Sequence, residues 1–257
     1  MHESVLSNLS SPWTGNKVML VTRDNSLFVR KVFKRKTDYL REIQAYQVVP
    51  EDLRPNLIKD EPSLLTVEIS YDPLPPSNAI SDFEIGRLMS RFHRSTLGMS
   101  PCVRDPGTGL TADTWLEYIR RQSGRWGDIV EGYLDRKVTG FLERYLQLLE
   151  LHNTAQLCLI HRDIRQENIG ARENSLILFD FELAIWGDPL WDVGRYLLSC
   201  QSLSDFVSGY GIPDNEVLTA YTGLFAFSFA EYLIRNGQTD GTDFHNCVQA
   251  ITKIGSM

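Results

Sequence analysis

The chain has 257 residues, of which 42% are hydrophobic and 23% are charged, a composition typical of a globular protein with a real core. This length suits one large domain or two modest lobes. The formal net charge of −7 is unevenly spread, because residues 1–70 carry ten Lys and Arg against nine Asp and Glu, and residues 71–257 carry sixteen against twenty-four. The acidic balance argues against nucleic acid as a partner and suits a cationic small molecule.

The sequence contains no segment that predicts export or membrane insertion. The N-terminus has an early acid and no continuous apolar run. The most apolar later stretch, residues 224–234, is short and contains Glu231, so it predicts a buried helix. The four cysteines lie far apart and lack zinc-ligand spacing. We therefore expect a cytoplasmic protein with reduced thiols and no membrane partner, and either a monomer or a homodimer fits.

Residues 1–70 predict a small antiparallel sheet with one helix. Residues 17–22 and 27–33 are rich in β-branched and aromatic side chains, and the RDNS between them has turn chemistry, so they predict a hairpin. A helix is expected next, with Thr37 or Asp38 as its N-cap. Two more strands are predicted at residues 56–60 and 63–70.

The rest of the chain is predicted to be mainly helical. Residues 71–78 contain three prolines and mark a boundary or linker. A helix follows, for which Ser81 and Glu84 predict a capping box. Further helices are expected at 112–122, 132–152, 190–200, 214–236 and 242–254, with a short β hairpin at 157–182. The fold class is therefore α+β, with a sheet-rich N-terminal lobe over 1–70 and a larger helical lobe over 71–257.

The segment HRDIRQENIG, residues 161–170, places an aspartate and an asparagine on one short loop. Asp163 and Asn168 lie five positions apart, and Asp180 falls at the end of the next apolar strand. Carboxylate and amide oxygens suit Mg²⁺, which is held by few protein groups together with substrate phosphates. A further carboxylate can accept a proton from a hydroxyl, which gives the set needed for phosphoryl transfer.

A cation for the donor phosphates is expected from the N-terminal lobe. Lys31 alternates with apolar residues in its strand, and a lysine buried there has to be paired. Glu42 lies between Leu40 and Ile43 on the following helix and is the expected partner. Lys34 is the alternative if the strand register differs.

These motifs together resemble the kinase-like phosphotransferases of the aminoglycoside phosphotransferase and choline kinase superfamily. The resemblance runs from about residue 12 to residue 200 and is strongest in LIHRDIRQENIG and LILFDFELAIWGDPLWDVGRYL. It implies a bilobal protein-kinase-like fold, ATP or GTP as donor and Mg²⁺ as cofactor. It also implies a catalytic role for Asp163, metal binding by Asn168, Asp180 and Glu182, and nucleotide binding by Lys31, Glu42 and the hinge residues Glu68 and Ser70.

The chain also departs from the protein kinases. It has Asp180-Phe181-Glu182 where they have Asp-Phe-Gly, and no long activation loop follows, which favours a small-molecule acceptor. Arg162 and Arg165 point the other way, since they match positions of protein kinases. The phosphate-covering loop has one glycine, Gly15, so its donors are expected to include hydroxyls, those of Ser10, Ser11 and Thr14.

The leading interpretation is a kinase that phosphorylates a hydroxyl of a small molecule, of aminoglycoside, choline or specialised-metabolite type. The alternatives are a protein kinase and a pseudokinase that binds nucleotide as a scaffold. Several polar and aromatic residues near the motif are expected to be structural instead: His93, His161, Trp186, Asp188, Trp191 and Asp192.

Overall fold

A computed structural model describes residues 3–8, 15–73, 75, 80–134, 137–151, 156–172, 175–213 and 215–252. The chain divides into two compact units. The first contains residues 1–80, 105–110 and 165–185, and the second contains 81–104, 111–164 and 186–257. Residues 105–110 and 165–185 thus group with the N-terminal segment, whereas the sequence predicted one division at residue 70.

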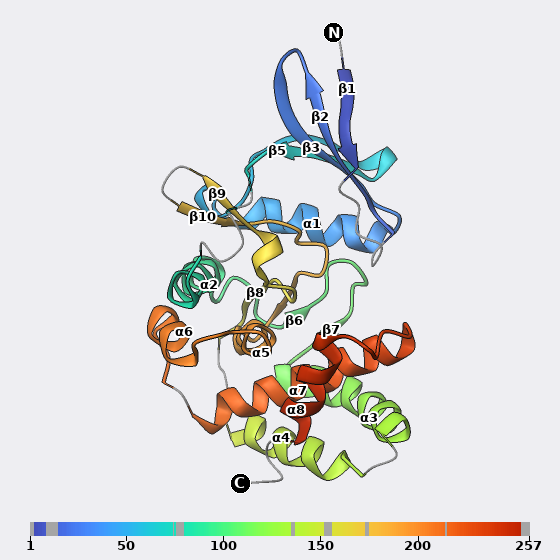
Figure 1. Ribbon diagram of the computed structural model, residues 1–257, viewed down its shortest axis with the longest axis vertical. Helices are drawn as coiled ribbons and strands as arrows, with labels where there is room; N and C mark the ends of the chain where they lie inside the picture. The colour runs from blue at the N-terminus through green and yellow to red at the C-terminus, as the bar shows by residue number, and fades with distance from the viewer. Residues whose placement is uncertain are drawn as a thin grey trace. The chain divides into compact units, whose positions relative to one another are not determined.

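The first unit is built on an antiparallel five-stranded sheet (Figure 1). In sheet order its strands are β1 (Glu3–Asn8), β2 (Lys17–Arg23), β3 (Ser26–Val32), β5 (Thr66–Ser70) and β4 (Leu57–Glu61). The expected β2–β3 hairpin turns at Asp24 and Asn25, both with positive φ, as a type I′ turn requires. β1 was not predicted, and β5 begins only at Thr66, because residues 62–64 form a 3₁₀ turn.

Helix α1 (Lys36–Val48) follows β3 in the first unit. The predicted N-cap was wrong: the helix begins after Arg35, whose side chain makes no capping bond, and both Thr37 and Asp38 lie in the first turn. Asp38 is buried instead and pairs with Arg35 and Arg41. The unit is completed by the short helices η1 (Glu51–Leu53), η2 (Pro62–Leu64) and η3 (Gln166–Asn168) and by the hairpin of β9 (Ile169–Arg172) and β10 (Ser175–Leu178).

An ion pair explains why the β9–β10 hairpin groups with the N-terminal segment. Arg172 on β9 forms a two-pronged pair with Asp72, with both N–O distances at 2.8 Å. The amide of Ala171 also donates to the carbonyl of Pro73 at 3.1 Å. The proline-rich segment was predicted as a linker. Asp72 and Pro73 of this segment bond to β9 as just described. Residues 74 and 76–79 lie outside the described residues.

The second unit is mainly helical. Its helices are α2 (Asp82–Thr96), α3 (Trp115–Leu134), α4 (Thr139–Leu151), α5 (Leu190–Leu197), α6 (Leu203–Tyr210), α7 (Glu216–Arg235) and α8 (Thr242–Thr252). Short strands β6 (Val103–Arg104), β7 (Thr111–Ala112), β8 (Cys158–Ile160) and β11 (Ile185–Gly187) form a small sheet. The capping box of Ser81 and Glu84 is present as predicted. α6 was not predicted, and α3 extends well beyond the expected residue 122.

Helix α7 forms the centre of this unit. It packs against α3, α4, α5 and α8. Within the described residues it is the one helix long and apolar enough for a membrane span by length and composition, and 61% of its apolar window is buried in the protein. Its apolar residues are therefore those of a core helix, as the sequence indicated for residues 224–234.

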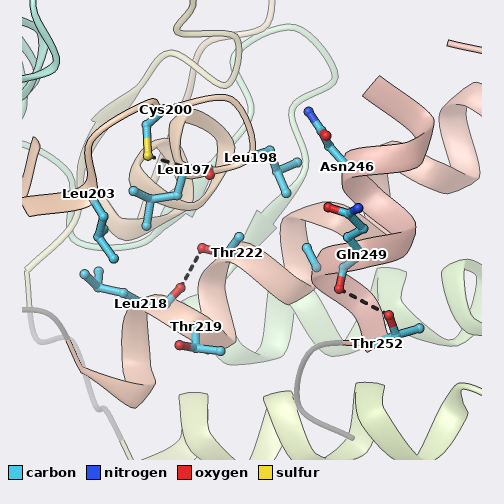
Figure 2. A pocket seen from close by; sticks show the side chains of 11 residues that line it. Leu197, Leu198, Cys200, Leu203, Leu218, Thr219, Thr222, Asn246, Gln249 and Thr252 are labelled. Carbon is cyan, nitrogen blue, oxygen red and sulfur yellow. Dashed lines mark hydrogen bonds between the residues drawn. The ribbon is translucent and has the colours of Figure 1, made fainter. Parts of the chain in front are cut away.

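The second unit also holds a cavity of about 600 Å³ (Figure 2). The described residues that line it carry no charge and come from the ends of four helices: Leu197, Leu198, Cys200, Leu203, Leu218, Thr219, Thr222, Asn246, Gln249, Ala250 and Thr252. None of the predicted site residues lines it.

Candidate active site

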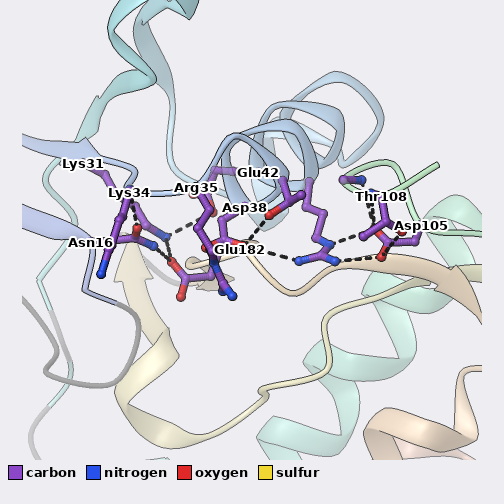
Figure 3. A network of polar contacts seen from close by, with 12 residues as sticks. Asn16, Lys31, Lys34, Arg35, Asp38, Glu42, Asp105, Thr108 and Glu182 are labelled. Atoms are coloured by element: carbon purple, nitrogen blue, oxygen red, sulfur yellow. Dashed lines mark hydrogen bonds and ion pairs between the residues drawn. The ribbon is translucent and has the colours of Figure 1, made fainter. Parts of the chain in front are cut away.

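Lys31 is the centre of a buried ionic cluster in the first unit (Figure 3). Its side chain is only 6% exposed. The ammonium nitrogen lies 3.3 Å from Glu42 Oε2 and 2.8 Å from Glu182 Oε2, and it also pairs with Asp180. The expected contact between Lys31 and Glu42 is therefore present, whereas the alternative, Lys34, is exposed.

The rotation of α1 directs Glu42 towards Lys31. Arg41, the preceding residue, forms two bonds to Asp105, from Nε at 2.8 Å and from Nη2 at 2.7 Å. A two-pronged guanidinium–carboxylate pair fixes orientation as well as distance. Glu42 is fully buried, and its second oxygen, Oε1, has no hydrogen-bond partner among the described residues. Neither Arg41 nor Asp105 was singled out in the sequence, since their separation of 64 positions carries no local signal.

One lysine shared by three carboxylates leaves excess negative charge. Burial by itself would lower the pKa of Lys31, but Asp180, Glu42 and Glu182 raise it well above its usual value. Burial raises the pKa of Glu42 to about 7 against the opposing effect of Lys31. The pKa of Glu182 is raised for the same reason. The cluster therefore has the electrostatic character of a site that accepts a further cation.

Two of the predicted metal ligands, Asn168 and Asp180, flank the same end of the β9–β10 hairpin. The last hairpin pair is Ile169 with Leu178, and beyond it the amide of Phe179 donates to the carbonyl of Asn168 at 3.1 Å. Asn168 and Asp180 are thereby placed on adjoining strand ends. Asp180 has a positive φ of 73°, a left-handed conformation that aspartate adopts more readily than most residues.

The donor set fits Mg²⁺ without forming a complete protein site. No group of three or more His, Cys, Asp or Glu side chains in the described part of the chain is arranged to hold a metal. Mg²⁺ needs only one or two carboxylates when substrate phosphates supply the other oxygens. Both carboxylates pair with Lys31, but Asp180 is 36% exposed at its side chain and can take that part, whereas Glu182 is 5% exposed and also accepts from Asn16.

Asn16 is a member of the cluster that the sequence did not reveal. Its amide nitrogen donates to Glu182 Oε2 at 2.7 Å, and its amide oxygen accepts from the backbone N–H of Lys34 at 2.8 Å. Asn16 directly follows Gly15 of the predicted phosphate-covering loop and thus joins the end of that loop to Glu182. The hydroxyl donors predicted in the loop, Ser10, Ser11 and Thr14, lie outside the described residues.

The side chains of the two predicted hinge residues face away from Lys31. Lys31 pairs with Val67 in the sheet, and alternation places the Glu68 side chain on the opposite face. There Glu68 binds Arg23 and Arg30. The Ser70 hydroxyl, on the same face as Glu68, donates to Asp72 at 2.7 Å. Any contact of these residues with a nucleotide would therefore come from the backbone, and the Ser70 amide already donates to the carbonyl of Asn56.

Asp163 lies in the second unit on a loop that is held by Asp192. Asp192 is fully buried, and its two oxygens accept from the amides of His161 at 2.7 Å and Arg162 at 2.6 Å. Arg162 has a positive φ of 70°, a strained conformation for a residue with a long side chain. The amide of Asp163 donates to Nδ1 of His161 at 3.3 Å. The loop is thus fixed by its backbone, and the Asp163 side chain is 23% exposed.

The residues expected to be structural do lie in packing or bracing positions. His161 is fully buried, and the ring nitrogens of His93 contact Asp192 Oδ2 at 3.0 Å and the Tyr210 hydroxyl at 2.8 Å. Asp188 accepts from the amide of Leu190 at the start of α5. Trp191 is 2% exposed and packs against Trp115, Trp126 and Phe225.

Comparison with known proteins identifies the chain. A family model described as "Phosphotransferase enzyme family" matches residues 6–227. The chain belongs to this family. It is therefore a small-molecule phosphotransferase, and the resemblance drawn from HRDIRQEN and DFE is confirmed.

Solved structures show the same fold at low sequence identity. A thermostable mutant of aminoglycoside phosphotransferase APH(4)-Ia, in its apo form, has a TM-score of 0.70 and 14% identity, with 99% of this chain and 97% of that chain covered. Choline kinase LicA from Streptococcus pneumoniae has a TM-score of 0.67 and 17% identity, with 100% of this chain and 94% of that chain covered. A putative fructosamine-3-kinase from Haemophilus somnus 129PT has a TM-score of 0.67 and 12% identity, with 99% of this chain and 91% of that chain covered. No curated protein matches the chain.

These structures confirm the predicted fold class, with an antiparallel-sheet N-terminal region and a mainly helical remainder. The roles of the individual residues are inferred from the geometry described above and not from these structures.

Proposed function

We propose that the protein is a Mg²⁺-dependent kinase that transfers the γ-phosphate of ATP or GTP to a hydroxyl of a small molecule. The observation that carries this proposal is the buried Lys31 ammonium, held by Glu42 and adjoining Asp180 and Glu182. A pre-positioned point charge beside excess carboxylates suits a nucleotide triphosphate that arrives with its metal.

Each half of the proposed chemistry has its own residues. Lys31, positioned by Glu42, would bind the donor phosphates, and backbone groups near Glu68 and Ser70 would contact the base. Asp180 and Asn168 would hold the metal, and Glu182 is assigned mainly to anchoring Lys31, with metal binding as a secondary role. When bound, Mg²⁺ would offset the negative charge of the donor phosphates. Asp163 would orient the acceptor hydroxyl and take its proton.

We infer a small-molecule acceptor because the sequence lacks the Asp-Phe-Gly motif and the long activation loop of protein kinases. Related folds include a complex of an aminoglycoside phosphotransferase with AMP-PNP and hygromycin B, and a choline kinase. These names define a practical test panel. A cytoplasmic location, the lack of nucleic-acid and membrane partners, and a monomeric or homodimeric state stay predictions.

The test is a nucleotide-depletion assay with ATP or GTP and Mg²⁺ against hygromycin B, choline, ethanolamine, a fructosamine and a general protein substrate. We expect turnover with at least one small hydroxyl compound, and a phosphate ester as product in ³¹P NMR. Turnover only with the protein substrate would make the chain a protein kinase. Nucleotide binding with no turnover across the panel, widened to sugars and amino alcohols, would favour the scaffold interpretation.

A further inference from the structure

Arg195 places a buried positive charge beside Asp163 in the second unit. It lies on α5, and its side chain is only 5% exposed. Its Nη2 is 3.4 Å from Asp163 Oδ1, longer than a typical N–H···O bond but within the range of an ion pair. Arg195 lies three positions after Asp192 and was not among the predicted site residues.

Two aromatic rings of α7 hold the guanidinium in this place. The guanidinium carbon lies 5.1 Å from the ring centre of Phe229 and 5.7 Å from that of Phe225. A planar, weakly hydrated guanidinium stacks on aromatic faces, and this contact compensates in part for its loss of water. Lysine has no planar group that could use both rings in this way.

The close approach of α5 to α7 makes this arrangement possible. A Cβ on Gly194 would lie only 2.6 Å from the carbonyl oxygen of Tyr221, so a larger residue would force the helices apart. The same helix carries Asp192, which fixes the amides of His161 and Arg162. One rigid helix thus positions both the backbone of the loop and a cation at the Asp163 carboxylate.

We propose that Arg195 is a positioning residue for phosphoryl transfer, acting through Asp163; this rests on the function proposed above. In that step the acceptor oxygen forms a bond to the γ-phosphorus and its proton passes to Asp163. The bond from the γ-phosphorus to the β–γ bridging oxygen breaks, and the nucleoside diphosphate leaves. Asp192 orients the loop backbone, whereas Arg195 fixes the plane of the carboxylate itself.

This division of work has a physical basis. An aspartate side chain on a fixed backbone can still rotate about two bonds, and each rotation moves its oxygens relative to the hydroxyl. Misplacing a reacting group by about 1 Å can cost roughly 10²-fold in rate. A charge partner on a rigid helix restricts that rotation through its contact with the carboxylate.

The experiment compares Arg195→Met, Arg195→Lys and Arg195→Ala with the wild-type protein, using ATP, Mg²⁺ and the hydroxyl compound turned over in the panel. We expect Arg195→Met to lower kcat by about 10–100-fold, with the KM for ATP nearly unchanged. Arg195→Lys should recover part of the loss because it keeps the charge. Millimolar guanidinium chloride should partly restore Arg195→Ala, while equal concentrations of sodium chloride should not. Arg235→Met is the matched control, since Arg235 is exposed and pairs with Glu231 instead, and it should leave kcat unchanged.

The outcomes separate this inference from the proposed function. No turnover by the wild-type protein with any acceptor would overturn both. Normal kcat in Arg195→Met would overturn only the role of Arg195. A loss of kcat that follows a loss of thermal stability, without recovery by lysine or guanidinium, would make Arg195 a structural residue, as would failure of both Arg195→Met and Arg195→Lys to fold.

Discussion

The Lys31 cluster and the Asp163 loop differ in how their charges are balanced. At Lys31, one cation is shared by three carboxylates, so charge is left over. At Asp163, the carboxylate has Arg195 beside it, and the neighbouring buried acid, Asp192, is satisfied by two amides and His93. The first region therefore carries the surplus negative charge that the proposed metal-bound nucleotide would need, whereas the charges of the second region are already paired within the protein.

Acidic residues therefore have different roles in the two regions. Asp192 is a bracing residue because all its charge is met within the second unit. Asp180, Glu42 and Glu182 share one ammonium, and burial, together with the neighbouring carboxylates, raises the pKa of both Glu42 and Glu182. A surplus of buried carboxylates is thus a better sign of a binding site than their number.

The largest effect is expected from Asp180→Ala. If the surplus charge serves a metal, this change should abolish activity at every Mg²⁺ concentration, because the nucleotide phosphates lose their metal partner. Isothermal titration should show that Mg²⁺ no longer strengthens nucleotide binding. Asp128→Ala, an exposed acid of α3, is the control and should behave as wild type. Equally tight nucleotide binding with and without Mg²⁺ in the wild-type protein would contradict the assignment.

Asp163→Asn tests the pre-organised region. We expect kcat to fall by roughly 10²–10⁴-fold, the range typical of a lost general base, while nucleotide affinity stays close to normal. The backbone bonds to Asp192 should survive, so the melting temperature should change little. Steady-state kinetics and nucleotide titration give the two quantities. Turnover near the wild-type rate would remove Asp163 from the mechanism.

Lys31 and Glu42 should act as one unit. Lys31→Ala is expected to reduce kcat/KM for the nucleotide by roughly 10–100-fold, and Glu42→Ala to have a milder effect of the same kind. The double variant should lose much less than the product of the two, since either change already breaks the same contact. Rates measured for all four proteins form the cycle. Losses that multiply fully would show that the two residues act separately.

Two glycines provide a stability test of the rigid α5–α7 contact. Gly194→Ala places a methyl group 2.6 Å from a backbone oxygen and should cost about 1–3 kcal/mol of unfolding free energy. Gly124→Ala, within α3, meets nothing within 4 Å and should stabilise the protein by about 0.5–1 kcal/mol. Urea denaturation measures both. A neutral or stabilising Gly194→Ala would mean that α5 is not held closely against α7.

The smallest effect is expected in the pH dependence of the metal-free protein. The pKa of Glu42 is raised from 4.5 to about 7 on folding, so the folded state holds a proton that the unfolded state has lost. This contribution is fully present below the unfolded value and disappears as pH rises through about 7. Melting temperatures should therefore decline less steeply over this interval in Glu42→Gln than in the wild type. Glu150→Gln, which changes an exposed acid, is the control, and equal slopes in wild type and Glu42→Gln would refute the raised value.

Local signals account for the features predicted correctly from the sequence. The capping box at Ser81 and the β2–β3 turn each depend on residues a few positions apart. The wrong N-cap of α1 shows the limit of such signals. Asp38 has the right chemistry to cap a helix, but Arg35 and Arg41 bind it inside the first turn.

The sequence by itself determined the family and the reaction class and predicted the candidate reactive groups, because these depend on residue types at short, fixed spacings. Only the tertiary structure decided which polar and charged side chains meet. Asn16 bonds Glu182 across 166 positions, and Arg195 reaches Asp163 across 32. No periodic pattern in the sequence predicts either pair. Their energies depend on burial and on distances of a few ångström, and the packing of whole helices and strands sets both.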